Sequence, residues 1–249
     1  MPLHAMTAKP VLGPSPGLDL RRIQALCFDL DGTLVDTDDA YVEWLTARFR
    51  PVARLVPPEV ARRWARRLIL AAETPANFLL GTPDFFGLDN ALGPLLDRRR
   101  PRPQDLARRF RLVPGIRPAL NRLGDRYPMA IISARELATV HAFLDAFDLR
   151  SMFPCVVAAR TVARMKPHPA PVLWAAAQMG VHPRACAMVG DTVVDVRAGR
   201  AAGAQTIAVL CGFGERGELE RAGADLILER TGDLAEVLLG SEGPPSERA

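Results

Sequence analysis

The chain has 249 residues, of which 49% are hydrophobic and 24% charged, the proportions of an ordinary globular protein. This length suffices for one or two domains with a large apolar core, and the composition excludes collagenous, disulfide-rich and wholly disordered chains. The 32 basic and 28 acidic residues leave a formal net charge of only +4, so we expect no nucleic-acid partner. Lys9 and Lys166 are the two lysines, and arginine carries the rest of the positive charge.

Neither a membrane span nor a secretion signal is predicted. No stretch reaches the roughly 18 uninterrupted apolar residues that a membrane-spanning helix needs. The proline-rich amino-terminal residues lack the apolar centre of a signal peptide. The four cysteines stand singly in apolar runs without CxxC spacing, which predicts reduced core residues and neither zinc ligands nor disulfides: Cys27, Cys155, Cys186 and Cys211. We therefore expect a cytoplasmic protein with no membrane partner.

The chain divides into a core, an insertion and two terminal segments. Residues 1–20 are predicted to be a disordered leader, and residues 241–249 a disordered polar tail. Residues 37–111 show only helical spacings of apolar residues, broken by prolines, which predicts an all-helical insertion. The strand-like runs lie in residues 21–36 and 112–240, which are predicted to form the core around this insertion.

Strand-like and helix-like segments alternate in the predicted core. Short apolar runs predict buried parallel strands at residues 23–28, 127–133, 154–158, 185–190, 204–210 and 224–228. Amphipathic segments predict helices at residues 116–123, 137–147, 169–180, 195–202 and 215–222. Repeated βα units build a parallel sheet with helices on both faces, so we predict an α/β fold: a doubly wound Rossmann-like core with an inserted helical cap. Such sheets bind ligands beyond the carboxyl ends of their strands.

Two carboxylates follow the first predicted strand. Asp29 and Asp31 stand two residues apart, at the point where a parallel sheet opens to solvent. Like charges this close repel unless a cation or a shared proton offsets them, so the pair indicates a bound metal or acid–base chemistry. Gly32 lets the backbone turn sharply beside a ligand. Taken alone, the motif is also compatible with a solvated Asp-Gly turn.

Four further polar side chains are predicted at the same edge of the sheet. Ser133 ends a predicted strand, where it is either a site hydroxyl or a helix N-cap. Lys166 offers a compact ammonium, which suits contact with a phosphoryl oxygen. Asp191 and Asp195 lie one helical turn apart, so both can face one ligand. Oxygen ligands in this number, without histidine or cysteine, favour Mg²⁺ over zinc and indicate phosphoryl transfer.

In chain order, these residues resemble the four motifs of the haloacid dehalogenase superfamily, namely DLDGT at 29–33, Ser133, KP at 166–167 and GDTVVD at 190–195. The resemblance extends over residues 24–230. The helical insertion and the run at residues 212–225 are similar to the phosphoglycolate-phosphatase-like group of that superfamily. The resemblance implies a Mg²⁺-dependent phosphatase that acts on a small phosphorylated metabolite, such as 2-phosphoglycolate, through an aspartyl-phosphate.

The resemblance also implies a role for each motif residue. Asp29 would be the nucleophile, and Asp31 would protonate the leaving oxygen and later activate water. Ser133 and Lys166 would receive the charge of the transferring phosphoryl oxygens. The implied Mg²⁺ ligands are Asp29, the backbone carbonyl of Asp31, Asp191 and, directly or through water, Asp195.

Single residues distinguish the implied function from other functions of the same superfamily. Asp31 disfavours dehalogenation, because a halide leaves without a proton. The absence of lysine between Lys9 and Lys166 excludes a Schiff-base phosphonatase. A phosphomutase of the β-phosphoglucomutase type uses the same aspartyl-phosphate, and a catalytically idle binding protein can keep the same fold, so both stay open as alternatives. The sequence specifies neither the substrate nor the oligomeric state.

Two residues beside the motifs have open interpretations. Arg135 lies two residues after Ser133, where it either contacts a second anionic group of the substrate or is exposed in the first turn of a helix. Thr33 is expected to orient the loop of the first motif without contacting the substrate.

Overall fold

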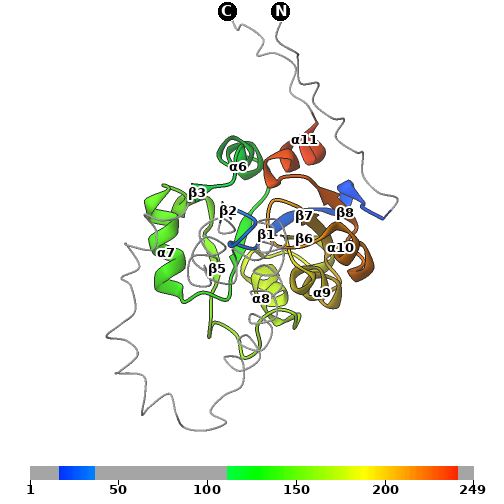
Figure 1. Ribbon diagram of the computed structural model, residues 1–249. Coiled ribbons are helices and arrows are strands. Elements are labelled where there is room, and N and C mark those ends of the chain that lie inside the picture. Colours follow the sequence, from blue (N-terminus) through cyan, green and yellow to red (C-terminus); the bar gives the residue numbers. More distant parts are fainter. Residues whose placement is uncertain (1–16, 37–110, 241–249) are drawn as a thin grey trace, which may run out of the picture.

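The computed structural model describes residues 17–36 and 111–240 of the chain (Figure 1). A six-stranded parallel sheet forms its centre, with the strand order β5-β4-β1-β6-β7-β8. The strands are β1 (Ala25–Phe28), β4 (Met129–Ile132), β5 (Cys155–Val157), β6 (Cys186–Gly190), β7 (Gln205–Val209) and β8 (Leu226–Leu228). Each lies inside a segment predicted to be a strand, so the strand predictions for the core are confirmed.

The chain adds strands first on one side of β1 and then on the other. The chain continues from β1 to β4 and β5 on one side and then crosses to β6, β7 and β8 on the other. Phe28 in β1 is in register with Ile131 of β4 and with Val189 of β6, so the carboxyl ends of these three strands lie side by side. Open parallel sheets bind ligands at such a reversal, which places the expected site here.

Helices cover both faces of the sheet (Figure 1). They are α6 (Ile116–Gly124), α7 (Leu137–Ala146), α8 (Ala170–Gln178), α9 (Val193–Ala202), α10 (Arg216–Ala222) and α11 (Leu234–Leu239). Because successive strand residues face opposite sides, Phe28 packs with residues of α6, α7 and α11, whereas Cys27 packs with residues of α8 and α9. This arrangement confirms the predicted α/β fold with a doubly wound core. Among the described residues, no helix combines the length and apolar character that a membrane span requires.

Two short strands, which the sequence analysis did not predict, join the core to the insertion. β2 (Val35–Asp36) and β3 (Arg111–Leu112) pair antiparallel. They hold side by side the two chain ends that flank the insertion, as expected where a chain leaves a domain and re-enters it. Residues 37–110 lie outside the described residues, so the helical cap predicted over residues 37–111 stays a prediction.

The packed part of the chain begins earlier than the sequence predicts. The backbone N–H of Asp19 donates to Gln205 Oε1 at 2.6 Å, and Gln205 Nε2 donates to the Asp19 carbonyl at 2.9 Å. Leu18 is buried as well. Residues 17–20, which the sequence analysis assigned to the disordered leader, therefore pack on the core, because one side-chain amide satisfies both backbone groups of Asp19. The rest of the leader and the tail lie outside the described residues.

The four cysteines are free thiols, as predicted. Cys27, Cys155 and Cys186 are buried, which confirms their expected place in the core. Cys211 is half-buried, with its Sγ 3.3 Å from the carbonyl oxygen of Gly32.

Candidate active site

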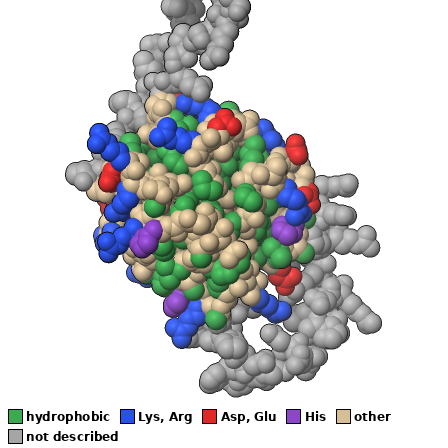
Figure 2. Space-filling view, turned by 180° about the vertical axis from the view of Figure 1, so that it is seen from behind, with side chains coloured by type: hydrophobic (Ala, Val, Ile, Leu, Met, Phe, Trp, Pro, Cys, Tyr) green, Lys and Arg blue, Asp and Glu red, His purple; other side chains and the backbone are tan. Residues whose placement is uncertain are grey.

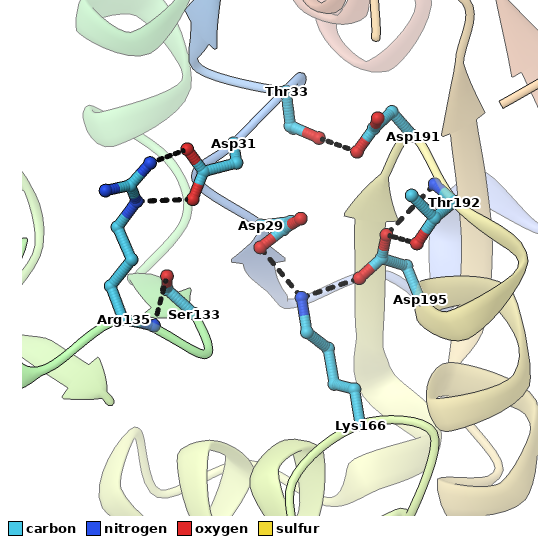
Figure 3. A network of polar contacts seen from close by, with 9 residues as sticks. All are labelled: Asp29, Asp31, Thr33, Ser133, Arg135, Lys166, Asp191, Thr192 and Asp195. Carbon is cyan, nitrogen blue, oxygen red and sulfur yellow. Dashed lines mark hydrogen bonds and ion pairs between the residues drawn. The ribbon is translucent and has the colours of Figure 1, made fainter. Parts of the chain in front are cut away.

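The predicted site residues converge at the carboxyl edge of the sheet (Figure 3). Five of them are buried, namely Asp29, Ser133, Lys166, Asp191 and Asp195. In that order, they belong to the loop after β1, the position directly after β4, the loop before α8, the loop after β6 and the first turn of α9. Asp31, the sixth, belongs to the same loop as Asp29 but is half-buried. Elements far apart in the sequence thus bring the six predicted side chains together at one edge of the sheet.

The loop after β1 turns tightly to place Asp29 and Asp31. The backbone N–H of Asp29 donates to the Val189 carbonyl at 2.9 Å, which extends the β1–β6 pairing to the first aspartate. Gly32 has a φ of +70°, and a Cβ at this position would lie 2.3 Å from Asp191 Oδ2. Glycine is therefore required at position 32 both for the left-handed backbone and for the close approach of Asp191.

Lys166 lies between two of the aspartates. Its Nζ is 2.7 Å from Asp29 Oδ1 and 2.6 Å from Asp195 Oδ1. Burial by itself lowers the pKa of Lys166, but the Asp195 and Asp29 carboxylates outweigh burial and raise that pKa above its ordinary value. The ammonium is therefore permanently charged and supplies one buried positive charge beside the predicted nucleophile.

Three carboxylates form a compact buried group. Asp29, Asp191 and Asp195 each offer an oxygen atom within 4.8 Å of the others. Asp31 contributes no carboxylate to this cluster, and the expectation that its backbone carbonyl binds the metal stays a prediction. Three buried aspartates with one ammonium leave negative charge uncompensated, which fits a hard divalent cation with oxygen ligands such as Mg²⁺.

Asp191 is held in place by groups from two other loops. The Thr33 hydroxyl donates to Asp191 Oδ1 at 3.2 Å, and the backbone N–H of Phe213 donates to Oδ2 at 2.7 Å. Gly212 allows this second contact, because a Cβ there would lie 2.1 Å from Oδ2. The Thr33 carbonyl accepts a 2.6 Å hydrogen bond from the Thr231 hydroxyl. Thr33 thus orients its loop as expected, and Thr231 is a supporting residue that the sequence analysis missed.

Asp195 is fixed at the start of α9. Its Oδ2 accepts hydrogen bonds from the Thr192 N–H at 3.0 Å and the Thr192 hydroxyl at 2.6 Å. The Thr192 side chain in turn accepts a hydrogen bond from the backbone N–H of Asp195, which completes a capping box and stabilises the amino-terminal turn of the helix. Because Thr192 occupies Oδ2 and Lys166 contacts Oδ1, Asp195 anchors the lysine and the helix as well as belonging to the acidic cluster.

The electrostatic environment of Asp29 disfavours its charged form when no cation other than Lys166 is near. The pKa of Asp29 is raised to about 8, and burial is the main cause. Lys166 acts against this rise, whereas the Asp195 and Asp31 carboxylates add to it. A divalent cation beside Asp29 would favour the carboxylate and reverse this shift.

Asp31 has a partner that the sequence left open. Arg135 Nε donates to Asp31 Oδ2 at 2.6 Å and Arg135 Nη2 donates to Oδ1 at 2.7 Å, so the guanidinium grips both carboxylate oxygens (Figure 3). Arg135 therefore belongs to the side-chain cluster of the candidate site, and it lies before helix α7. Its position two residues after Ser133 was the signal in the sequence, but nothing there indicated Asp31 as the partner.

Ser133 is not a helix cap. Helix α7 begins at Leu137, and the residue before it, Glu136, is the N-cap. The Ser133 Oγ is buried and accepts a 3.2 Å hydrogen bond from the backbone N–H of Arg135. The structure thus favours the site-hydroxyl interpretation over the capping one.

A profile of haloacid dehalogenase-like hydrolases matches residues 23–203. The chain belongs to this family. The phosphoglycolate phosphatase of Chromobacterium violaceum is 28% identical over 228 residues, which are 89% of this chain and 99% of that protein. The N-acetylmuramic acid 6-phosphate phosphatase of Pseudomonas aeruginosa is 27% identical, over 87% of this chain and 95% of that protein.

A solved structure agrees with this assignment. A haloacid dehalogenase-like protein of unknown function from Agrobacterium tumefaciens superimposes with a TM-score of 0.63 and 26% identity, over 87% of this chain and 97% of that one. The family match and the two relatives together identify this chain as a phosphatase of the phosphoglycolate-phosphatase-like group.

Proposed function

We propose that this phosphatase hydrolyses a small phosphorylated metabolite, a phosphoglycolate-like monoester, with Mg²⁺ as its cofactor and an aspartyl-phosphate on Asp29 as its intermediate. The contact of Lys166 with Asp29, inside the acidic cluster, is the observation that carries the proposal. It is consistent with a candidate nucleophile, a fixed positive charge and a set of hard oxygen ligands at the same edge of the sheet. The two relatives named above are phosphatases of small phosphorylated molecules, which supports the same substrate class.

The first step of the proposed reaction joins Asp29 to phosphorus. An oxygen of the Asp29 carboxylate attacks the phosphorus atom, and the bond between phosphorus and the ester oxygen breaks with its electron pair going to that oxygen. Asp31, in the same loop, gives its proton to the departing oxygen. The alcohol is thereby released, and the phosphoryl group stays on Asp29.

The second step restores the enzyme. The Asp31 carboxylate, now without its proton, takes a proton from a water molecule, whose oxygen attacks the phosphorus of the aspartyl-phosphate. The bond between phosphorus and Asp29 breaks, inorganic phosphate forms, and Asp29 is a carboxylate again. Asp31 can carry out both transfers only when at least one of its oxygens is released from Arg135.

Charge on the phosphoryl oxygens is offset by groups fixed before the reaction. Lys166 is held by two carboxylates, and the Ser133 hydroxyl ends the neighbouring strand β4. Mg²⁺ would be held by Asp29, Asp191 and Asp195, together with the expected backbone carbonyl of Asp31, and when bound it supplies positive charge to the phosphoryl oxygens. Charges that are already fixed in a buried site need no reorganisation when the transition state forms.

Phosphate release from a panel of phosphorylated metabolites, with and without Mg²⁺, tests the proposal. We expect Mg²⁺-dependent release that falls by at least about 1,000-fold in Asp29→Asn, because the nucleophile is lost. Asp145→Asn is the matched control, since Asp145 is an exposed aspartate paired with Arg150. Full activity of Asp29→Asn, or no release from any ester, would overturn the proposal. Isomerisation of glucose 1-phosphate without phosphate release would replace it with the mutase alternative.

A further inference from the structure

Of the two cations that the structure describes in the site, Arg135 is the more exposed. Its side chain is 18% exposed and that of its partner Asp31 23%, whereas the side chain of Lys166 is only 7% exposed. The guanidinium binds a carboxylate through two parallel hydrogen bonds of 2.6 and 2.7 Å. This fork geometry matches carboxylate and phosphate groups, and in this structure the group that it binds is a carboxylate. The structure therefore shows Arg135 binding a carboxylate group at a partly exposed position of the site.

We propose that Arg135 selects the substrate by binding a carboxylate of its leaving alcohol, which takes the place of Asp31 on the guanidinium. This inference rests on the proposed phosphatase function and adds to it the residue that would recognise the acid group of a hydroxy-acid phosphate. It assigns to Arg135 the role of a specificity-determining residue.

The position of Arg135 supports this role. Lys166 lies on the Asp29 side of the site, where the phosphoryl group is transferred, and Arg135 lies on the Asp31 side (Figure 3). Because Asp31 protonates the departing oxygen in the proposed reaction, the leaving alcohol lies near Asp31 and hence near Arg135. A carboxylate close to the ester oxygen of the substrate would meet the guanidinium directly.

The backbone of Arg135 is fixed, so only its side chain needs to change partner. Its N–H donates to Ser133 Oγ at 3.2 Å, and its carbonyl accepts a 2.9 Å hydrogen bond from the N–H of Ala159. These contacts join the loop after β4 to the segment after β5. An exchange of one carboxylate for another would thus leave the loop, and Ser133 within it, in place.

The exchange also removes a conflict in the substrate-free site. Both oxygens of Asp31 accept hydrogen bonds from Arg135, yet the proposed reaction needs one of them for proton transfer. Releasing Asp31 would leave a partly buried guanidinium without this partner, which is costly. A carboxylate on the substrate compensates for the loss, whereas a neutral alcohol does not. The enzyme is therefore expected to act faster on carboxylated esters than on neutral esters of the same size.

Matched pairs of esters test this inference. The hydrolysis of 2-phosphoglycolate, phospholactate and 3-phosphoglycerate is compared with that of their carboxamides, which have the same shape without the charge. For at least one pair we expect the wild-type enzyme to favour the carboxylate by about 10- to 100-fold in kcat/KM, mainly through KM. In Arg135→Gln this preference should disappear, because acid and amide then meet the same neutral side chain. Arg135→Lys should keep part of the preference, since it retains the charge but not the fork.

Arg150→Gln is the matched control, because Arg150 forms the same kind of two-bonded pair with Asp145 on an exposed surface. It should leave the preference unchanged, and thermal unfolding of every variant shows that it is folded. Equal hydrolysis of acid and amide by the wild type would overturn the inference while leaving the proposed function intact. An equal loss for both members of a pair in Arg135→Gln would overturn it too, since Arg135 would then only position Asp31. Failure of the phosphatase proposal is separate and appears as no phosphate release from any ester of the larger panel.

Discussion

Lys166 and Asp29 form a buried ion pair, with 2.7 Å between Nζ and Oδ1, although 137 positions separate them in the chain. The pair connects the loop before α8 with the loop after β1, at the centre of the sheet. It positions the proposed nucleophile and supplies the charge that a phosphoryl oxygen needs. Removing the lysine therefore affects both folding and activity.

Lys166→Met should inactivate the enzyme and destabilise the fold. The substitution leaves the Asp195 carboxylate, and above about pH 8 also that of Asp29, buried without the shared cation, and breaking a buried pair in this way costs about 3–5 kcal/mol. Denaturant unfolding without metal measures this cost, and phosphate release measures the activity. Arg216→Gln serves as the control, because its pair with Glu229 is exposed and contributes little. Near wild-type turnover by Lys166→Met would contradict the role given to the lysine.

Thr33→Val should weaken Mg²⁺ binding by about tenfold or more, because the hydroxyl that orients Asp191 is lost. Calorimetric titration of Mg²⁺ into the metal-free protein measures the affinity. Thr206→Val is a matched control, because the Thr206 hydroxyl donates to Asp225 Oδ2 at 2.9 Å. This substitution removes a contact of the same kind at a place away from the acidic cluster. Both variants should lose about 1 kcal/mol of stability, but only Thr33→Val should bind Mg²⁺ more weakly. Equal Mg²⁺ affinities in the two variants would argue against a positioning role for Thr33.

Binding of Mg²⁺ should release a proton from Asp29 at neutral pH. Burial raises the pKa of Asp29 to about 8 without metal, so the acid is protonated below that pH and must ionise to become a ligand. The apparent affinity for Mg²⁺ should therefore increase as the pH rises toward about 8 and level off above it. Titrations at pH 7 in two buffers with different ionisation enthalpies count the protons released. Buffer-independent heats would show that Asp29 is already ionised.

The stability of the metal-free protein should fall as the pH rises from about 4 to about 8. In this window the folded protein holds a proton on Asp29 that the unfolded chain, with an aspartate pKa of about 3.9, has already lost. Lys166 stays charged throughout, because its pKa is raised, and it adds no slope. Asp29→Asn should remove this part of the pH dependence. Denaturant unfolding at a series of pH values checks it, and an identical slope in the variant would show that other groups cause it.

Gly32→Ala should abolish Mg²⁺ binding, because the added Cβ would lie 2.3 Å from Asp191 Oδ2. Gly180→Ala is the matched control, since Gly180 has a φ of +69° against +70° for Gly32 but no atom within 4 Å of an added Cβ. The control should lose only about 1–2 kcal/mol for its left-handed backbone, without effect on Mg²⁺. Thermal unfolding and Mg²⁺ titration separate the two effects. Intact metal binding in Gly32→Ala would mean that Asp191 moves aside without loss of function.

The sequence by itself determined the fold class and predicted six side chains that the structure brings together at the candidate site. Runs of apolar residues identified all six strands of the sheet, since strands buried on both faces contain few polar residues. The carboxyl ends of those strands then located Asp29, Ser133 and Asp191. The sequence analysis did not identify β2 and β3, because a strand of two residues has no periodicity to detect. It also placed residues 17–20 in the leader, because their contact with Gln205 involves backbone groups that carry no sequence signal.

Only the tertiary structure decided which side chains are partners. Arg135 grips Asp31, Thr33 orients Asp191, and the partners are 104 and 158 residues apart in the chain. Their contact depends on β1 lying between β4 and β6, an order that local patterns do not encode. The physical reason is that hydrophobic periodicity reports which residues are buried, whereas hydrogen bonds and ion pairs form within about 3 Å and require the assembled sheet.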